Sequence, residues 1–316
     1  MKKLLLAAAA TSMVAGPVAA QGIDFSGYSR FGLQYVEDNV GGFDNGEVRF
    51  TGRFRLTADV ATDTDFGARL SARFRAQSDM GVQENLNFSS PRFAVSGGGL
   101  TVAIGNIFGA IESLPGHYFG SRSAGIGLTG LGFVNMAGNV SGRNFAWDAF
   151  ASRGAGVSPN NAVEAIYSAA GFTGHISYTE VPATGAERVA GFVSYTFGEY
   201  TAALGIQDSD FAFEDKVIGT IGANFGDFRV NFQAADNRGV KKVVLNGAFN
   251  VTPEATLYGF ISNESGNRPG PDRAFNGTGG GVGVAYALGG GASVETGVTR
   301  GSDSRVRADV GMFFSF

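Results

Sequence analysis

The chain contains no cysteine, only two histidines, and no apolar run of about 18 residues beyond its first 20 positions. Without cysteine there is no disulfide framework and no thiolate metal site. Without a long apolar run there is no helix of the length that crosses a bilayer. A formal net charge of −4 gives no basic field, and no basic run is interleaved with aromatics, which excludes nucleic acid as a partner.

Glycine and phenylalanine are abundant, at 50 and 28 residues, and apolar residues alternate with polar ones near the end of the chain. The apolar positions there are Val306, Ala308, Val310, Met312, Phe314 and Phe316. A period of two indicates a strand with one apolar face, and about ten residues is the length that a tilted strand needs to cross a membrane. The ending on an aromatic residue is typical of the last strand of a bacterial outer-membrane barrel.

The other end of the chain predicts export. A charged start over residues 1–3 precedes an apolar run over residues 4–15, and Val18–Ala20 supply the small residues of a cleavage site. We therefore expect residues 1–20 to be a secretory signal peptide and residues 21–316 to be the mature chain. The alternative, a retained membrane anchor, would need about 20 apolar residues.

Period-two patterning continues through the whole chain and predicts about sixteen strands. Two of them, over residues 86–96 and 100–105, are less regular, because Pro91 would interrupt a central ladder. In lipid every backbone amide must be paired, so the strands must close into an antiparallel barrel without edges. A soluble exported sandwich is the alternative, but it would need about half as many strands and a second layer over the many outward aromatics.

The predicted connections alternate between tight turns and longer polar loops, one of which covers residues 236–241. Short turns at one rim and long loops at the other are typical of outer-membrane barrels, and an even strand number places both termini at the short-turn, periplasmic rim. Sixteen strands enclose a lumen too wide to be filled by side chains, so the barrel should hold an aqueous channel.

The longest connection, residues 106–161, is far longer than ordinary loops and is therefore expected to be functional. It contains a helix-compatible piece over Phe108–Gly116 and an apolar, glycine-rich segment over Gly125–Gly138. Packing inside the barrel explains that apolar segment better than exposure to water does. We expect this third long loop to fold into the lumen as a constriction loop. The alternative is an extracellular loop packed on its neighbours or on another subunit.

Seven arginines on the first three predicted strands share the inward parity, opposite the aromatic residues. They are Arg30 on the first strand, Arg49, Arg53 and Arg55 on the second, and Arg69, Arg73 and Arg75 on the third. Arginine does not lose its charge when it is crowded, because its pKa exceeds about 12. We expect the seven to converge on one patch of the lumen, where they would attract anions and orient dipolar solutes.

Few acids and histidines accompany this arginine cluster. The long loop carries only Glu112 and Asp148, and Glu164 follows it on an inward face. We expect Glu112 to be the constriction-loop acid nearest the arginines. His117 and His175 stand in no motif that supplies a nucleophile or metal partner, so we expect polar roles in the lumen and no enzymatic activity.

No metal or cofactor site is expected in the sequence. Acids and amides over Asn39–Asp44 and Asn263–Asp272 could at most hold a divalent cation at the loop rim, since no calcium-loop spacing is present.

Two segments, Tyr195–Ile206 and Gly281–Phe316, together with the single long loop and the terminal Phe316, resemble the sixteen-stranded general porins of alphaproteobacteria, the Rhodobacter type. The resemblance implies a homotrimer in the outer membrane of a Gram-negative bacterium, contacting its lipid. Each barrel would pass small hydrophilic solutes and ions, and Phe316 would be read by the insertion machinery. A solute-selective channel of the same fold is the main alternative, and an outer-membrane enzyme or adhesin fits least.

Overall fold

The computed structural model describes residues 21–38, 46–80, 87–117, 161–181, 185–210, 215–266, 276–302 and 304–316. The predicted signal peptide and residues 118–160 of the long loop, which include Asp148, lie outside the described residues. Within the described ranges, no helix is long and apolar enough to cross a membrane.

The described residues form seventeen strands and one short helix, α1 (Ala110–Ser113). The strands are β1 (Gln21–Val36), β2 (Val48–Asp63), β3 (Arg69–Met80), β4 (Asn87–Phe88), β5 (Arg92–Gly97), β6 (Leu100–Gly105), β7 (Asn161–Ala169), β8 (Phe172–Val181), β9 (Ala186–Phe197), β10 (Tyr200–Ser209), β11 (Lys216–Phe225), β12 (Phe228–Asn237), β13 (Val240–Asn250), β14 (Ala255–Ser265), β15 (Gly277–Gly289), β16 (Ala292–Arg300) and β17 (Val306–Ser315).

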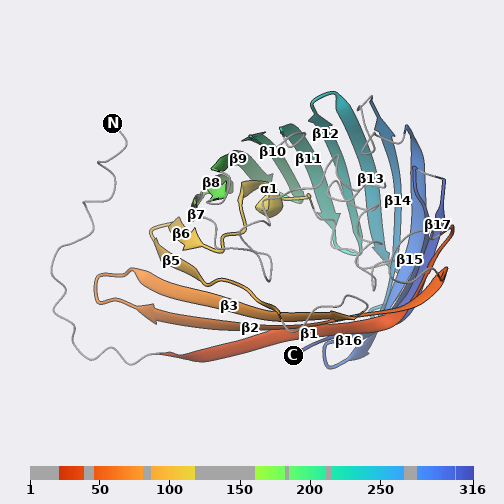
Figure 1. Cartoon of the computed structure of the whole chain (residues 1–316), viewed down its shortest axis with the longest axis horizontal. Helices are drawn as coiled ribbons and strands as arrows, with labels where there is room; N and C mark the ends of the chain where they lie inside the picture. Colours follow the sequence, from red (N-terminus) through yellow and green to blue (C-terminus); the bar gives the residue numbers. More distant parts are fainter. Residues whose placement is uncertain are drawn as a thin grey trace.

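The strands close into one antiparallel barrel, as the sequence predicts (Figure 1). β1 pairs with β2 on one side and with β17 on the other, and the pairing continues from neighbour to neighbour around the ring. Apart from the two-residue β4, every described strand is therefore paired on both sides, which is the condition for a sheet that stands in hydrocarbon. Figure 1 shows the C-terminus beside β1, at the seam of the barrel.

Two of the strands, β4 and β5, share one position in the ring, so the barrel is sixteen strands around. Both pair with β3, and the break between them falls at Ser89–Pro91. Proline has no N–H for the ladder, which is why the strand is interrupted there. The amide of Ser89 still donates to the Arg75 carbonyl at 2.8 Å, so the interruption is local. The irregularity expected at Pro91 is confirmed.

Side chains alternate between the two faces of the wall. On β9, Val189 and Val193 point outward and are 54% and 63% exposed, whereas Arg188 and Ser194 point inward and are buried. Apolar side chains that face outward from a transmembrane barrel contact lipid. The polar side chains are thereby gathered on the lumen side.

β3 begins at Arg69, because the side chain of Thr64 closes a turn just before it through hydrogen bonds with Ala68. One detail of the expected layout is wrong. The loop expected over residues 236–241 is a two-residue turn, Arg238–Gly239, with φ values of 50° and 86°. Positive φ at both central residues is the geometry of tight hairpins, so the polar composition of this stretch does not mark a long loop.

Phe316 completes the seam between the two ends of the sheet. Its carbonyl accepts from the Gly27 amide at 2.9 Å, and its own amide donates back to Gly27 at 3.1 Å. The Phe316 ring stacks on Phe54, with centroids 5.8 Å apart. A Cβ at position 27 would lie 2.7 Å from this ring, so the ring can occupy this place only because residue 27 is glycine.

We predict that deleting Phe316 lowers the amount of folded barrel in the outer membrane much more than it changes the conductance of each pore. The deletion removes two seam hydrogen bonds and one aromatic stack on the outer face of the wall, whereas the arginine side chains point to the lumen on the opposite face. Membrane fractionation combined with single-channel recording measures both quantities. Normal surface levels of the deletion would refute the role in assembly.

Candidate pore lining and constriction

After β6 the chain turns into the barrel instead of away from it. Gly105 and Gly109 take positive φ values of 84° and 78°, which L-residues rarely adopt, and so re-aim the chain at both ends of this bend. Between them, Ile107 is completely buried. Helix α1 follows and contacts β8, β9 and β10 from the lumen side (Figure 1).

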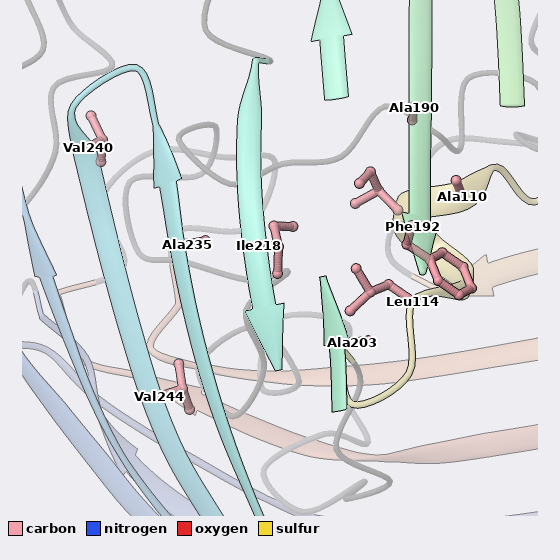
Figure 2. Packing of buried hydrophobic residues seen from close by; sticks show 10 residues of the cluster. Ala110, Leu114, Ala190, Phe192, Ala203, Ile218, Ala235, Val240 and Val244 are labelled. Carbon is pink, nitrogen blue, oxygen red and sulfur yellow. The ribbon is translucent and has the colours of Figure 1, made fainter. Parts of the chain in front are cut away.

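Apolar contacts hold this first part of the long loop to the inner wall. Figure 2 shows Leu114 and Ala110 beside Phe192 of β9, a region where a wide barrel would otherwise need polar side chains. Gly205 of β10 makes the close approach possible, because a Cβ there would lie 2.4 Å from the Cδ1 atom of Leu114. The inner wall is therefore shaped to receive the loop.

Hydrogen bonds fix the start of α1 to β7 and β8. The Gly109 amide donates to Oε2 of Glu164 at 3.1 Å, and the Ala110 amide donates to the hydroxyl of Ser177 at 3.0 Å. Each strand residue thus satisfies a backbone N–H that the short helix itself leaves without an intrahelical partner.

A second pair of hydrogen bonds fixes the end of the described loop to β11 and β12. The Thr220 hydroxyl donates to the Pro115 carbonyl at 2.6 Å, and the side-chain amide of Asn231 donates to the Gly116 carbonyl at 2.9 Å. His117, which follows, is buried. Residues 106–117 therefore cross the inner face from β6 to β12.

The predicted arginines form a column on the facing wall, β1 to β3, and do not all converge. Arg49 bonds Gln34 next to the 37–47 connection, whereas Arg69 bonds Asp63 at the opposite, short-turn end. At about 3.3 Å per residue these two positions lie on the order of 45 Å apart along β2. The expected single patch is therefore wrong for Arg49 and Arg69, because parity fixes the face of a strand but not the height along it.

Arg30, Arg53 and Arg55 make up one group within the column. Arg30 lies directly opposite Arg53 in the β1–β2 register, and Arg55 lies opposite Tyr28 with its guanidinium 5.3 Å from the ring centroid. Arg55 also bonds the side-chain oxygen of Gln77 at 2.7 Å.

Two carboxylates on the same wall neutralise part of the arginine column. The sequence did not predict them as site residues. Asp79 accepts from Arg53 at 2.5 Å, and Asp59 accepts from Arg73 at 2.7 Å. Both acids share the inward parity of the arginines, so the sequence alone places them on the same face. Which arginine each acid pairs with depends on the register of β2 against β3.

Phe108, at the entry to the loop, gathers three guanidinium groups. The guanidinium carbons of Arg75, Arg73 and Arg92 lie 5.0, 5.7 and 5.8 Å from its ring centroid. Arg92 was not among the predicted arginines, because the strand is irregular around Pro91 and the alternation there does not show which face Arg92 occupies. Cation–π contact of this kind holds guanidinium groups around an aromatic face.

The predicted acid and the second histidine lie close to these groups. Glu112 lies in α1 and makes a small favourable electrostatic contribution at Arg55, and its role as the loop acid nearest the arginines stays a prediction. Glu164 is buried on β7 and bonds Arg92 at 2.7 Å. His175 on β8 is buried as well, and its Nε2 atom lies 3.2 Å from Glu164. Among the described residues, no three or more His, Asp or Glu side chains lie together in a group that could hold a metal ion.

His117 is held in its neutral form by its surroundings. Burial, and then the nearby ammonium groups of Lys216 and Lys242, keep the pKa of His117 well below its usual value of about 6.5. Lys242 is itself 3.6 Å from the Glu264 carboxylate. Protonation of His117 would add a third positive charge at this docking point.

These features define a class of protein: a transmembrane β-barrel whose polar lumen carries charged side chains and receives a loop from its own chain. The family model of Gram-negative porins matches residues 6–306, so the chain belongs to that family. Porins act as channels in the outer membrane of Gram-negative bacteria and are not enzymes.

Curated and solved relatives agree with this assignment. A porin of Fuscovulum blasticum is 29% identical, and a porin of Rhodobacter capsulatus is 25% identical. Each match covers 93% of this chain and 100% of the relative. Among solved structures, a mutant of Rh. blastica porin superposes with a TM-score of 0.76 at 24% identity, with 93% of this chain and 100% of the other covered.

We predict that acidification weakens the folded barrel through His117. Above about pH 6.5 the imidazole is neutral in both the folded and the unfolded chain, so the full stability is present. As the pH falls below that value the unfolded chain binds a proton first, and stability is lost at up to about 1.4 kcal/mol per pH unit until the folded pKa is passed. Unfolding temperatures between about pH 5 and pH 7.5 measure the loss.

The matched variant for this prediction is His117→Gln, which keeps a polar side chain but does not titrate. Its acid sensitivity should be smaller than that of the parent. Identical pH profiles for the two proteins would show that His117 does not carry the effect.

Proposed function

We propose that this chain is a general diffusion porin, in which small hydrophilic solutes and ions pass passively through a water-filled pore. In this proposal residues 21–316 form the mature barrel, and residues 106–161 form a constriction loop that narrows it. The observation that carries the proposal is the docking of residues 106–117 on the inner wall, with the Phe108 ring against Arg73 and Arg75 of the arginine column.

The arginine column would set the electrical character of this pore. A lumen bounded by low-dielectric walls focuses the field of its fixed charges on whatever passes. Arg53 and Arg73 share their charge with carboxylates, so the wall is partly neutralised and polar rather than uniformly positive. A field of this kind favours anions moderately and turns dipolar solutes, which suits broad passage better than tight binding.

A solute-selective channel of the same fold is the second candidate, and one observation favours it. Tyr28 and Phe313 point inward and stack with centroids 5.5 Å apart, beside Arg55. A selective channel would extend such contacts into a track along the lumen. Among the described strands, the other inward aromatics lie apart from this pair: Phe192 is covered by α1, and Tyr258 and Phe260 pack beside Ala248 on β13 and β14. The pair therefore stays isolated, and general diffusion is the better supported function.

The proposed assembly is a homotrimer. Small outward residues, among them Gly27, Ser29 and Ala292, lie near both chain ends, where they permit close approach of a second barrel. A groove of about 480 Å³ on this outer face crosses β1, β2 and β14–β17 and is lined mainly by apolar side chains, including Leu33.

We predict that replacing Arg53, Arg55, Arg73 and Arg75 by alanine shifts the reversal potential under a salt gradient toward cations. Four positive charges leave the wall, each worth roughly 1 kcal/mol at 4 Å even in bulk water, and Asp59 and Asp79 lose their partners. Conductance should stay level or rise, because bulky side chains are gone. The shift should shrink in about 1 M salt, where the screening length is near 3 Å.

The control for this experiment is Leu56→Ala on the lipid-facing side of β2, which should leave selectivity unchanged. If the quadruple variant keeps the ion preference of its parent at low salt, the permeation path does not run past these arginines.

We further predict that the protein runs as a high-mass band in mild detergent and collapses to the monomer only on boiling. Ala308→Trp, which would fill the outer groove from β17, should weaken this band while the isolated barrel remains folded. A fully functional monomer at all detergent concentrations would contradict the trimer.

A further inference from the structure

The carboxylate of Glu164 is the one described group that bonds the entry of the long loop and the arginine-rich side of the lumen at the same time. It is 1% exposed, on the inner face of β7. We infer that Glu164 is a positioning residue, which fixes the start of the constriction loop and thereby sets both the width of the pore and the charge that Arg92 presents to it. The inference rests on the proposed function, since it concerns the same loop.

The two carboxylate oxygens have separate partners. Oε1 accepts from Nε and Nη2 of Arg92, at 2.9 and 2.7 Å. Oε2 accepts from the Gly109 amide at 3.1 Å and lies 3.2 Å from Nε2 of His175. One side chain therefore joins β5, β7, β8 and the loop. A buried carboxylate is costly unless it is paired and hydrogen-bonded, and here both oxygens are satisfied.

The position of Gly109 makes this contact specific. Its φ of 78° turns the amide toward the wall, and the residues on either side of it, Phe108 and Ala110, are held by the arginines and by Ser177. Among the described residues, the hydrogen bonds that join the first turn of the loop to β7 and β8 are the two accepted by Glu164 and by Ser177. Loss of either should loosen this turn.

Arg92 connects the Glu164 carboxylate, which holds the loop, with the charged side chains of the lumen. Its guanidinium is shared between Glu164 and the ring of Phe108, next to Arg73 and Arg75. Removing the carboxylate leaves the Arg92 charge without this partner. Glu164 therefore has two separable effects, one on the position of the loop and one on the charge of the lumen.

The experiment compares four variants by single-channel recording in planar bilayers at low salt. Ser177→Ala removes a loop tie and keeps all charges, Glu164→Gln removes the charge and keeps the shape, and Glu164→Ala removes both. Asp63→Asn is the matched control, because it breaks an arginine–carboxylate pair, with Arg69, at the end of the barrel remote from the loop.

Each variant has its own expected signature. Ser177→Ala should make the open-channel current noisier without a change of selectivity. Glu164→Gln should raise the anion-over-cation permeability ratio about twofold, as expected for one unit charge roughly 10 Å from the path in water. Glu164→Ala should do both, and Asp63→Asn should do neither. If Glu164→Ala does not insert, the Ser177→Ala and Glu164→Gln recordings still decide the question.

A cross-link provides the rescue. The chain has no cysteine, so the pair Ala110→Cys and Ser177→Cys would introduce a single disulfide where the amide and hydroxyl now meet at 3.0 Å. In the Glu164→Ala background the oxidised pair should restore the quiet current but not the parent's ion preference. Reduction should bring the noise back within the same sample.

The inference is overturned if the wild-type pore conducts but the Glu164 and Ser177 variants behave like Asp63→Asn. Failure of the proposed function would look different, because the parent protein itself would then form no pore. A disulfide that leaves the noise of Glu164→Ala unchanged would also contradict the inference, since it would separate the noise from the loop tie.

Discussion

The structure depends on the pairing of every backbone amide that stands in the hydrocarbon of the membrane. An unpaired N–H or C=O in lipid costs several kcal/mol, so a sheet can span only when its first strand meets its last. Here β1 pairs with β17, and the terminal Phe316 bonds Gly27 across that seam. Once the ring is closed, the alternation of side chains forces apolar groups toward lipid and polar groups toward the lumen.

The closed ring creates a second problem, because a barrel of sixteen strands is too wide for the side chains of its wall to fill. The chain fills part of it with its own loop. Docking of residues 106–117 uses apolar contact at Leu114, a glycine opposite it at position 205, and backbone amides received by strand side chains. The arginines of the facing wall are held in place by ion pairs with Asp59 and Asp79 and by contact with the Phe108 ring. The position of the loop and the charge of the wall therefore depend on each other.

Much of this was predictable from residue patterns. Period two, the length of the strands and the terminal aromatic predict the barrel, its sixteen positions and the break at Pro91. The height of each arginine, the pairing of Arg53 with Asp79 and the tie from Glu164 to Gly109 were not predictable, because they depend on register and on contacts between residues far apart in the chain. The two-residue turn at Arg238–Gly239 was missed because polar composition does not reveal φ.

The central claim is that water and ions fill the lumen beside the docked loop. Single-channel conductance of the wild-type protein, recorded over a wide range of potassium chloride concentrations, tests it most directly. A general diffusion pore should conduct in proportion to the bulk salt, with an excess toward low salt from the fixed charges of the wall. A current that saturates early, and is blocked by one particular solute, would indicate a binding site that controls passage and would contradict the account.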